Sequence, residues 1–186
     1  MGELIYSTIT SLDGFIADEH GNFDWAEPDA EVHGFVNDQE RPIATYLYGR
    51  KLYEIMAVWD DDDWLVGEPD VVTDYAQLWR AAEKVVFSTT LDEVRTNRTR
   101  LERTFDVDAV RRLVADAMTD VGIGGAHLAA HAVRAGLVAE YRLLVNPVIV
   151  GSGTSWLPGG ERVDLELVDE RRFASGVVHL RYRSRG

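Results

Sequence analysis

The stretch "DVGIGGAHLAAH", residues 120–131, combines the end of an apolar strand, a glycine-rich turn and the start of a helix. A glycine turn lets the backbone approach a ligand closely, and the first N–H groups of a helix attract an anion. The turn is therefore either a phosphate site or only a tight corner. It is not the G-x-G-x-x-G fingerprint, because residue 127 is a histidine, and it lies late in the chain. Both facts argue against a standard Rossmann dehydrogenase.

Strands and helices alternate on both sides of this turn. Apolar runs predict a strand that starts at residue 4 and breaks at Asp13-Gly14, and further strands at 44–49, 84–90 and 119–125. Helical spacing predicts helices at 29–39, 50–56, 74–82, 106–117 and 126–136. The remainder, 139–153 and 165–185, indicates further strands with hairpin connections. Such alternation predicts an α/β domain of three layers, with a mostly parallel sheet, flanking helices and antiparallel strands added at the C-terminal end. Ligands of such sheets bind at the carboxyl ends of the strands.

Composition limits the possible functions. The 186 residues suit a single domain, 1–186, and carry a formal net charge of -13. Such an acidic chain disfavours binding to nucleic acid or to an anionic membrane. It contains no cysteine, which excludes disulfides and cysteine-ligated zinc. The start "MGELIYSTIT" lacks the features of a signal peptide, so we expect a cytoplasmic protein.

Three predicted strands end in residues that suit a dinucleotide. The first ends at Gly49, followed by the cations Arg50 and Lys51, and the second ends in the hydroxyl residues 88–90. The third ends in the glycine turn at 122–126. Two separate phosphate sites, one with basic side chains, favour NADPH over NADH. Each glycine turn taken alone is common in α/β proteins and is a weak signal.

The ordered set "TSLDGFIA", "YLYGRKLYEIM", "VVFSTTL" and "GIGGAHLAAHAVRAGLVAEYRLLVNPVIVGSG" resembles the dihydrofolate-reductase-like proteins, and most closely the reductase domain of the bacterial riboflavin-biosynthesis deaminase-reductase. The resemblance covers residues 4 to about 180 and implies an eight-stranded mixed sheet, an NADPH cofactor and, in many members, a homodimer. It also implies a cis bond between Gly124 and Gly125. The cofactor-binding residues that it implies are Ala17, Gly49, Arg50, Lys51, Ser88, Thr89, Gly122, Ile123, Gly124, Gly125, Ala126 and Leu128.

The resemblance implies hydride transfer from NADPH to the C=N or C=O bond of a small pterin-, folate- or ribosylaminopyrimidine-like heterocycle. Asp13, in the loop over the nicotinamide, is one candidate catalytic residue. Counting back from Gly49 to the carboxylate position of the folate enzymes reaches His33, while a small shift would choose Asp29 or Glu31. We expect Trp25, Asp29 and Trp59 to contact the substrate. The absence of a clear carboxylate leaves an alternative, a non-catalytic module that binds a nucleotide, a pterin or a flavin.

Three further features have a simpler reading. His127 and His131 could share a metal at i and i+4, but there is no third ligand in the pattern, so we expect surface side chains and no metal site. The four acids of "WDDDDW", residues 59–64, could hold Mg²⁺ or Ca²⁺, which prefer several oxygen ligands, but we favour a solvated loop at a helix end. The arginines between 95 and 103 could assist a cofactor phosphate, or form a charged hairpin or loop.

Overall fold

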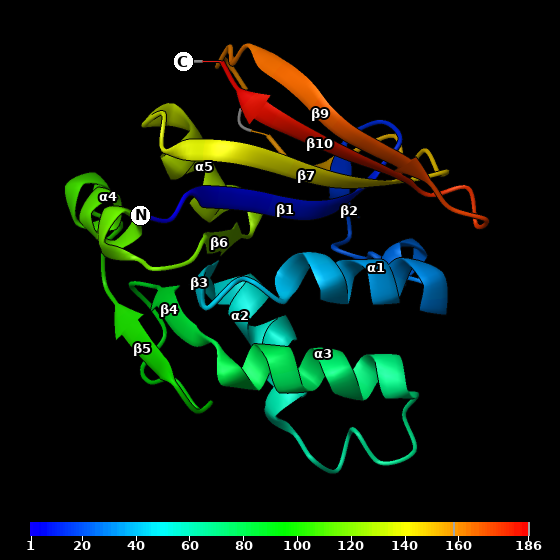
Figure 1. Ribbon diagram of the computed structural model, residues 1–186, viewed down its shortest axis with the longest axis horizontal. Helices are drawn as coiled ribbons and strands as arrows, with labels where there is room; N and C mark the ends of the chain where they lie inside the picture. Colours follow the sequence, from blue (N-terminus) through cyan, green and yellow to red (C-terminus); the bar gives the residue numbers. More distant parts are fainter. Residues whose placement is uncertain (158, 186) are drawn as a thin grey trace.

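The computed structural model describes residues 1–157 and 159–185 and is built around one eight-stranded sheet (Figure 1). The strand order is β5-β4-β3-β6-β1-β7-β10-β9. The strands are β1 (Leu4–Ser11), β3 (Thr45–Gly49), β4 (Glu83–Phe87), β5 (Thr99–Glu102), β6 (Val121–Gly124), β7 (Val138–Asn146), β9 (Leu165–Arg172) and β10 (Val178–Ser184). A separate ribbon pairs β2 (Phe15–Asp18) with β8 (Gly153–Ser155).

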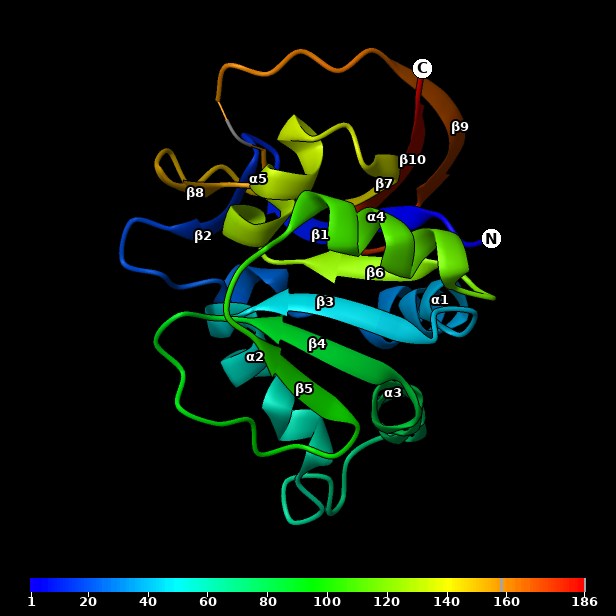
Figure 2. The same ribbon diagram turned by 90° about the vertical axis from the view of Figure 1, so that its left-hand side faces the viewer.

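The six strands from β5 to β7 in this order are parallel, and β10 is antiparallel to both of its neighbours. The predicted mixed sheet with antiparallel C-terminal strands is therefore confirmed. All parallel strands end at the same edge. Figure 2 shows the arrows of β3 and β4 ending on the side where α2 begins and where the β2–β8 ribbon lies.

Helices cover both faces of the sheet. The helices are α1 (Ala30–Glu40), α2 (Arg50–Met56), α3 (Asp70–Ala81), α4 (Val107–Asp116) and α5 (Ala126–Arg134), with short 3-10 turns η1 (Asp24–Ala26) and η2 (Ala57–Asp60). None of the helices in the described part of the chain is both long and apolar enough to cross a bilayer. Asp29 and Asp106 begin α1 and α4, because each carboxylate accepts the N–H three residues on.

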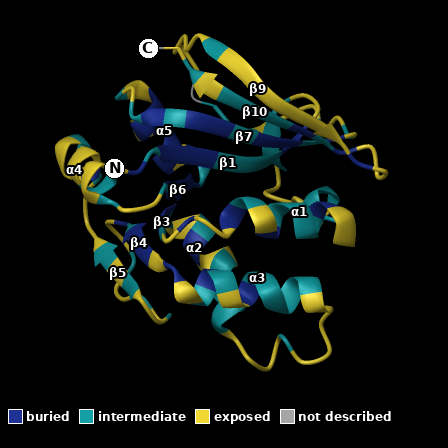
Figure 3. Ribbon diagram, viewed as in Figure 1, coloured by how far each residue is buried: buried dark blue, intermediate teal, exposed yellow. Residues whose placement is uncertain are grey.

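The core lies in two layers, one on each side of the sheet. Alternation along β1 sends Tyr6 toward α5 and Ile5 toward the opposite face, and each residue joins a different apolar cluster. The α5 face is lined by alanines such as Ala129 and Ala132, whose small side chains let the helix lie close to the strands. Figure 3 shows β7, β1 and β6 as the most buried strands and β9 as exposed.

Two predicted elements differ from the structure. The segment between Arg95 and Arg103 was expected to be a hairpin or loop, but Thr99–Glu102 pairs in parallel with β4 and is the edge strand β5. Its sequence "TRLE" has too few apolar residues to show a strand, because it is buried on one face only. Helix α3 begins at Asp70, four residues before the predicted start. The adjacent β-branched Val71 and Val72 hide this first turn, which follows Pro69.

His179 supplies a prediction about stability. It lies in β10 with 2% of its surface exposed, and its ring is 4.7 Å from that of Phe35. Neither ring nitrogen has a hydrogen-bond partner among the residues that the structure describes. Burial lowers the pKa of His179 below its ordinary value. The folded protein therefore resists protonation that the unfolded chain accepts, so stability is full above the unfolded pKa and is lost as the pH falls through it.

We expect His179→Leu to remove this part of the acid destabilisation, because leucine fills a similar volume without a titratable group. The melting temperature should be compared at about pH 7.5 and about pH 5.5, either side of the ordinary histidine pKa of about 6.5. His20→Gln, at an exposed histidine, is the matched control. The same melting-temperature difference between the two pH values in His179→Leu and in the unmodified protein would contradict this account.

Candidate active site

The glycine turns after β3 and β6 lie in direct contact at the carboxyl edge of the sheet. A Cβ on Gly125 would lie 3.9 Å from the backbone nitrogen of Gly49 and 3.5 Å from Cβ of Leu52. A Cβ on Gly49 would lie 3.5 Å from Cβ of Leu128, and one on Gly124 would lie only 2.5 Å from Cδ2 of Leu52. Side chains at these turns would therefore fill the space between the start of α2 and the start of α5.

Gly125 begins α5 without a side-chain cap. Its φ is +88°, a conformation that glycine adopts without strain. The N–H groups of the first turn of α5 are thus available to an anion. The predicted cis bond between Gly124 and Gly125 is wrong, because the described residues contain no cis peptide bond. The positive φ of Gly125 supplies the sharp change of direction instead.

Gly122 and Ile123 lie one step back from this turn, inside β6. A Cβ on Gly122 would lie 2.8 Å from Cδ1 of Tyr46, so this glycine makes room for the tyrosine on β3. Ile123 is 2% exposed and belongs to the core on the α5 face. Both residues thus shape the sheet behind the turn, and any cofactor contact from them would come from backbone atoms.

Cations and hydroxyl groups surround the end of β4. Arg50 bonds through Nη1 to Oγ1 of Thr90 at 3.0 Å and through Nε to Glu54 at 2.7 Å. Arg103, beyond β5, donates to the carbonyl oxygen of Ser88 at 3.3 Å and to that of Leu91 at 2.6 Å. The Ser88 hydroxyl accepts the N–H groups of Thr90 and Leu91. Two guanidinium groups therefore flank the loop in which Ser88 and Thr89 were expected to bind a phosphate.

Asp13 fastens the turn between β1 and β2. Its carboxylate accepts from the Ser11 hydroxyl at 2.7 Å, from the Gly151 N–H at 2.8 Å and from the Val150 N–H at 3.2 Å. The Ser11 hydroxyl and then these backbone groups hold the pKa of Asp13 below its usual range. Ala17 follows in β2, where it pairs with Thr154. Asp13 thus holds the loop over the strand ends, and its lowered pKa keeps it ionised.

His33 is held by an amide whose orientation is fixed. Asn37, 1% exposed, donates through Nδ2 to the carbonyl oxygen of Val71 and to Oδ2 of Asp74, both at 2.8 Å. Its Oδ1 is therefore an acceptor, and His33 Nδ1, at 3.0 Å, must donate to it. The bonds from Arg41 and then Asn37 lower the pKa of Asp74. The neutral imidazole accordingly carries its proton on Nδ1 and leaves the Nε2 lone pair free.

The predicted substrate residues divide into two neighbouring groups. Trp59 lies in η2, with its ring 6.2 Å from that of His33 and 4.7 Å from that of Tyr75. Trp25 and Asp29 instead line a cavity of about 280 Å³ between η1, the start of α1 and the end of β7. Asp29 lies one helical turn before His33, so the two groups adjoin along α1. Sequence reasoning did not single out Asn37, Asp74 or the cavity residue Asn146.

His131 and the acidic run at residues 59–64 contact neighbouring side chains and backbone groups of the fold. His131 stacks on Phe105 at 5.7 Å. In the acidic run, Asp62 pairs with Arg80, and Asp60 accepts the N–H of Asn97. Among the described residues, no group of three acidic or histidine side chains is placed to hold a metal ion.

Comparison with known proteins identifies relatives of the whole chain. The family model of the RibD C-terminal domain matches residues 3–179. The uncharacterized protein YyaP of Bacillus subtilis (strain 168) is 31% identical over 187 residues, covering 98% of this chain and 95% of that protein. A Shewanella sp. PV-4 structure, described provisionally as a riboflavin biosynthesis protein, matches with a TM-score of 0.77 at 20% identity and 99% coverage of both chains.

Two more distant structures share the fold. Dihydrofolate reductase from Enterococcus faecalis, complexed with NADP(H), matches with a TM-score of 0.64 at 13% identity, covering 100% of this chain and 98% of that one. A Thermotoga maritima diaminohydroxyphosphoribosylaminopyrimidine deaminase/5-amino-6-(5-phosphoribosylamino)uracil reductase matches with a TM-score of 0.64 at 13% identity, covering 99% of this chain and 57% of that one. The fold is therefore that of the dihydrofolate-reductase-like proteins.

Proposed function

The chain belongs to the RibD C-terminal domain family, and on that premise we propose that it is an NADPH-dependent reductase of a small heterocyclic substrate. The observation that carries the proposal is the contact between the glycine turns at Gly49 and Gly125. The two glycines add no side chain of their own beside the start of α5, which no side chain in the described part of the chain caps. A pyrophosphate would bind at this helix start, because backbone N–H groups and the helix dipole favour an anion there.

The neighbouring side chains support a phosphorylated dinucleotide. Arg50 and Arg103 lie around the Ser88–Thr90 loop, within reach of a second phosphate, and Lys51 adds a third cation at the start of α2. The relative from E. faecalis is complexed with NADP(H), and its fold matches this chain over its whole length. In the proposed arrangement, Ala126 and Leu128 lie beside the pyrophosphate, and the β1–β2 turn with Asp13 and Ala17 covers the nicotinamide.

When bound, the reduced nicotinamide supplies a hydride to the carbon of a C=N or C=O bond and is left oxidised. The chain must then deliver a proton to the nitrogen or oxygen. His33 suits this role, because its Nδ1 is engaged by Asn37 while Nε2 forms no hydrogen bond with the described residues. Protonated His33 would donate from Nε2. Asp13 suits it less, since its lowered pKa keeps it without a proton near neutral pH.

The reductase and the non-catalytic module differ in turnover. We expect the purified protein to oxidise NADPH in the presence of at least one of dihydrofolate, dihydrobiopterin and an aminouracil riboside. Binding of NADPH without turnover of any of these compounds would favour the module. A yellow protein with a visible absorption band would indicate a bound flavin and would contradict NADPH as the resident dinucleotide.

We also propose a homodimer formed through the β-rich end of the chain. Strand β9 is the edge of the sheet, and its residues Leu167 and Val168 are 46% and 38% exposed. Unpaired edges with apolar side chains tend to associate. Sedimentation velocity should give twice the monomer mass, and a monomer over the whole accessible concentration range would contradict the proposal.

A further inference from the structure

The cavity beside α1 is lined by polar groups that form no hydrogen bond with other described residues. Asn146, the last residue of β7, is 7% exposed and lines the cavity. Its side-chain amide makes no hydrogen bond within the described residues, and its polar atoms are not closed off from the cavity, so a ligand can reach them. The amide offers both donors and an acceptor, which match the complementary edge of a cyclic amide.

Two further groups line the same cavity. The indole Nε1 of Trp25 is buried and has no hydrogen-bond partner within the described part of the chain, so it is an unpaired donor. Asp29 uses Oδ1 to cap α1 through the N–H of Val32, which leaves Oδ2 as a free acceptor. Val177 and Pro147 supply apolar walls. A planar ring that presents an acceptor, an amide edge and an amino group would satisfy all three polar groups.

The charge around the cavity disfavours a phosphate. The flanking segment 22–40 contains several acids and no lysine or arginine, and residues 146–156 carry no charge at all. Glu27 and Asp29 line the cavity itself. Of the two arginines at the end of β9, Arg171 is held by Glu31 at 3.0 Å, and its guanidinium lies over the rings of Phe35 and Phe173. Arg172 alternates with it along the strand and points to the opposite face of the sheet.

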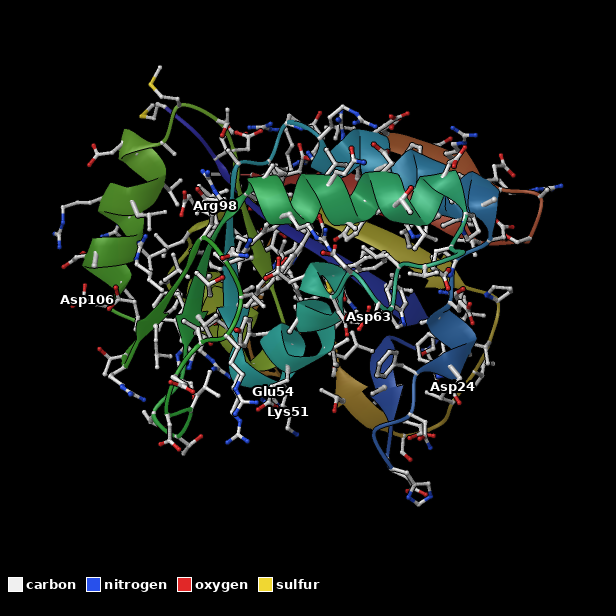
Figure 4. All side chains as sticks on the ribbon, turned by 90° about the horizontal axis from the view of Figure 1, so that it is seen from below. Asp24, Lys51, Glu54, Asp63, Arg98 and Asp106 are labelled. Carbon is white, nitrogen blue, oxygen red and sulfur yellow. The ribbon has the colours of Figure 1, made fainter. Side chains whose placement is uncertain are left out.

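The acidic cavity contrasts with the basic end of the site. In Figure 4 the labelled Asp24, in η1 beside the cavity, lies to the right of Lys51, which lies in the first turn of α2 at the strand ends. Phosphate groups are recognised by arginine, lysine or free helix N-termini. Arg50, Arg103 and the start of α5 provide these at the strand ends, but at the cavity the N-terminus of α1 is already occupied by the carboxylate of Asp29.

We propose that this cavity binds the substrate as an unphosphorylated, neutral or cationic heterocycle with an amide edge and an amino group. The proposal deepens the reductase function and rests on it for the role of the ligand. It separates this chain from a relative whose name specifies a phosphoribosylamino compound, the T. maritima enzyme. The phosphates bound by the protein would then be those of the dinucleotide alone.

The test is a calorimetric titration without NADPH, using 5-amino-6-ribosylaminouracil and its 5′-phosphate as a matched pair. We expect the riboside to bind and the phosphate to bind about tenfold or more weakly, with a difference that shrinks as salt is added. Equal or tighter binding of the phosphate, or binding of neither compound, would overturn the proposal. Because NADPH is absent, the result is independent of turnover: a protein that binds the riboside but reduces nothing loses only the reductase function.

Variants locate the binding. The double variant Glu27→Gln, Asp29→Asn should bind the riboside and its 5′-phosphate with similar affinities. Asp63→Asn, outside the cavity, should leave the ratio of these affinities unchanged. Asn146→Leu keeps the bulk and removes the amide, and Trp25→Phe keeps a ring and removes the donor. Each of these two variants should bind the riboside severalfold more weakly, while its circular dichroism spectrum remains that of the native protein. Unchanged affinity in both variants would place the ligand elsewhere and overturn the assignment of the cavity.

Discussion

His33→Gln is expected to lower kcat by about a hundredfold or more, the ordinary contribution of a general acid or base, with the affinity for NADPH unchanged. The imidazole ring lies against Trp59 and Tyr75, and its Nε2 forms no hydrogen bond with the described residues, while Nδ1 is fixed by Asn37. Glutamine retains a polar side chain but cannot deliver a proton. Stopped-flow measurement of NADPH oxidation, with a separate binding titration, distinguishes the chemical step from cofactor binding.

His20→Gln is the matched control for this variant, because His20 is exposed and contacts only Glu19 as an ion-pair partner. The pH–rate profile gives a second readout. Its shape should differ between His33→Gln and the unmodified protein, and should be the same in His20→Gln as in the unmodified protein. A variant that retains the wild-type rate and profile would show that the proton comes from another group.

Arg50→Ala is expected to weaken the binding of NADPH by about tenfold or more and to leave the binding of NADH nearly unchanged. A hydrogen bond to a charged group contributes about 1.5–3 kcal/mol, and each tenfold change corresponds to about 1.4 kcal/mol. Arg50 already reaches Thr90, on the loop that follows Ser88, so its guanidinium is placed for a phosphate at that loop. Only NADPH carries the additional phosphate on its adenosine.

The control for Arg50 is Arg98→Ala. Arg98 is exposed to a similar extent and is likewise paired with one glutamate, Glu83, but it lies at the start of β5, away from the turns. The Arg98→Ala variant should bind NADPH and NADH with the affinities of the unmodified protein. If Arg50→Ala weakened NADPH and NADH equally, the arginine would contact a part common to both, and the second phosphate would have to lie elsewhere.

Local patterns in the sequence were enough to predict the parallel sheet and its ends. The buried strands ending at Gly49 and Gly124 are short apolar runs followed at once by helical spacing, and such runs determine both the element and its edge. Strand β5 was not predicted, because the side chains of its four residues point alternately into the protein and into solvent. The positions of Gly49 and Gly125 at helix starts were likewise predictable, whereas the reason for Gly122 was not, because it depends on the ring of Tyr46 in the adjacent strand.

The parts of the site that depend on tertiary contacts could not be predicted. Asn37 meets Asp74 from 37 residues away, and this contact determines which nitrogen of His33 carries the proton. Asn146 and Trp25 line the same cavity because the end of β7 lies next to η1. Nothing in the sequence near either residue marks this proximity. Local spacing also gave no indication that Asp13 would bond to the backbone at residues 150 and 151.

The central claim, that the two glycine turns and the basic loop hold a phosphorylated dinucleotide, is tested most directly by titrating the protein with NADPH and with NADH. Tryptophan quenching and energy transfer to the nicotinamide would follow the binding. The account predicts saturable binding of NADPH, tighter than that of NADH by about tenfold or more because of the extra charged contacts. Binding of neither cofactor, or equal binding of both, would contradict it.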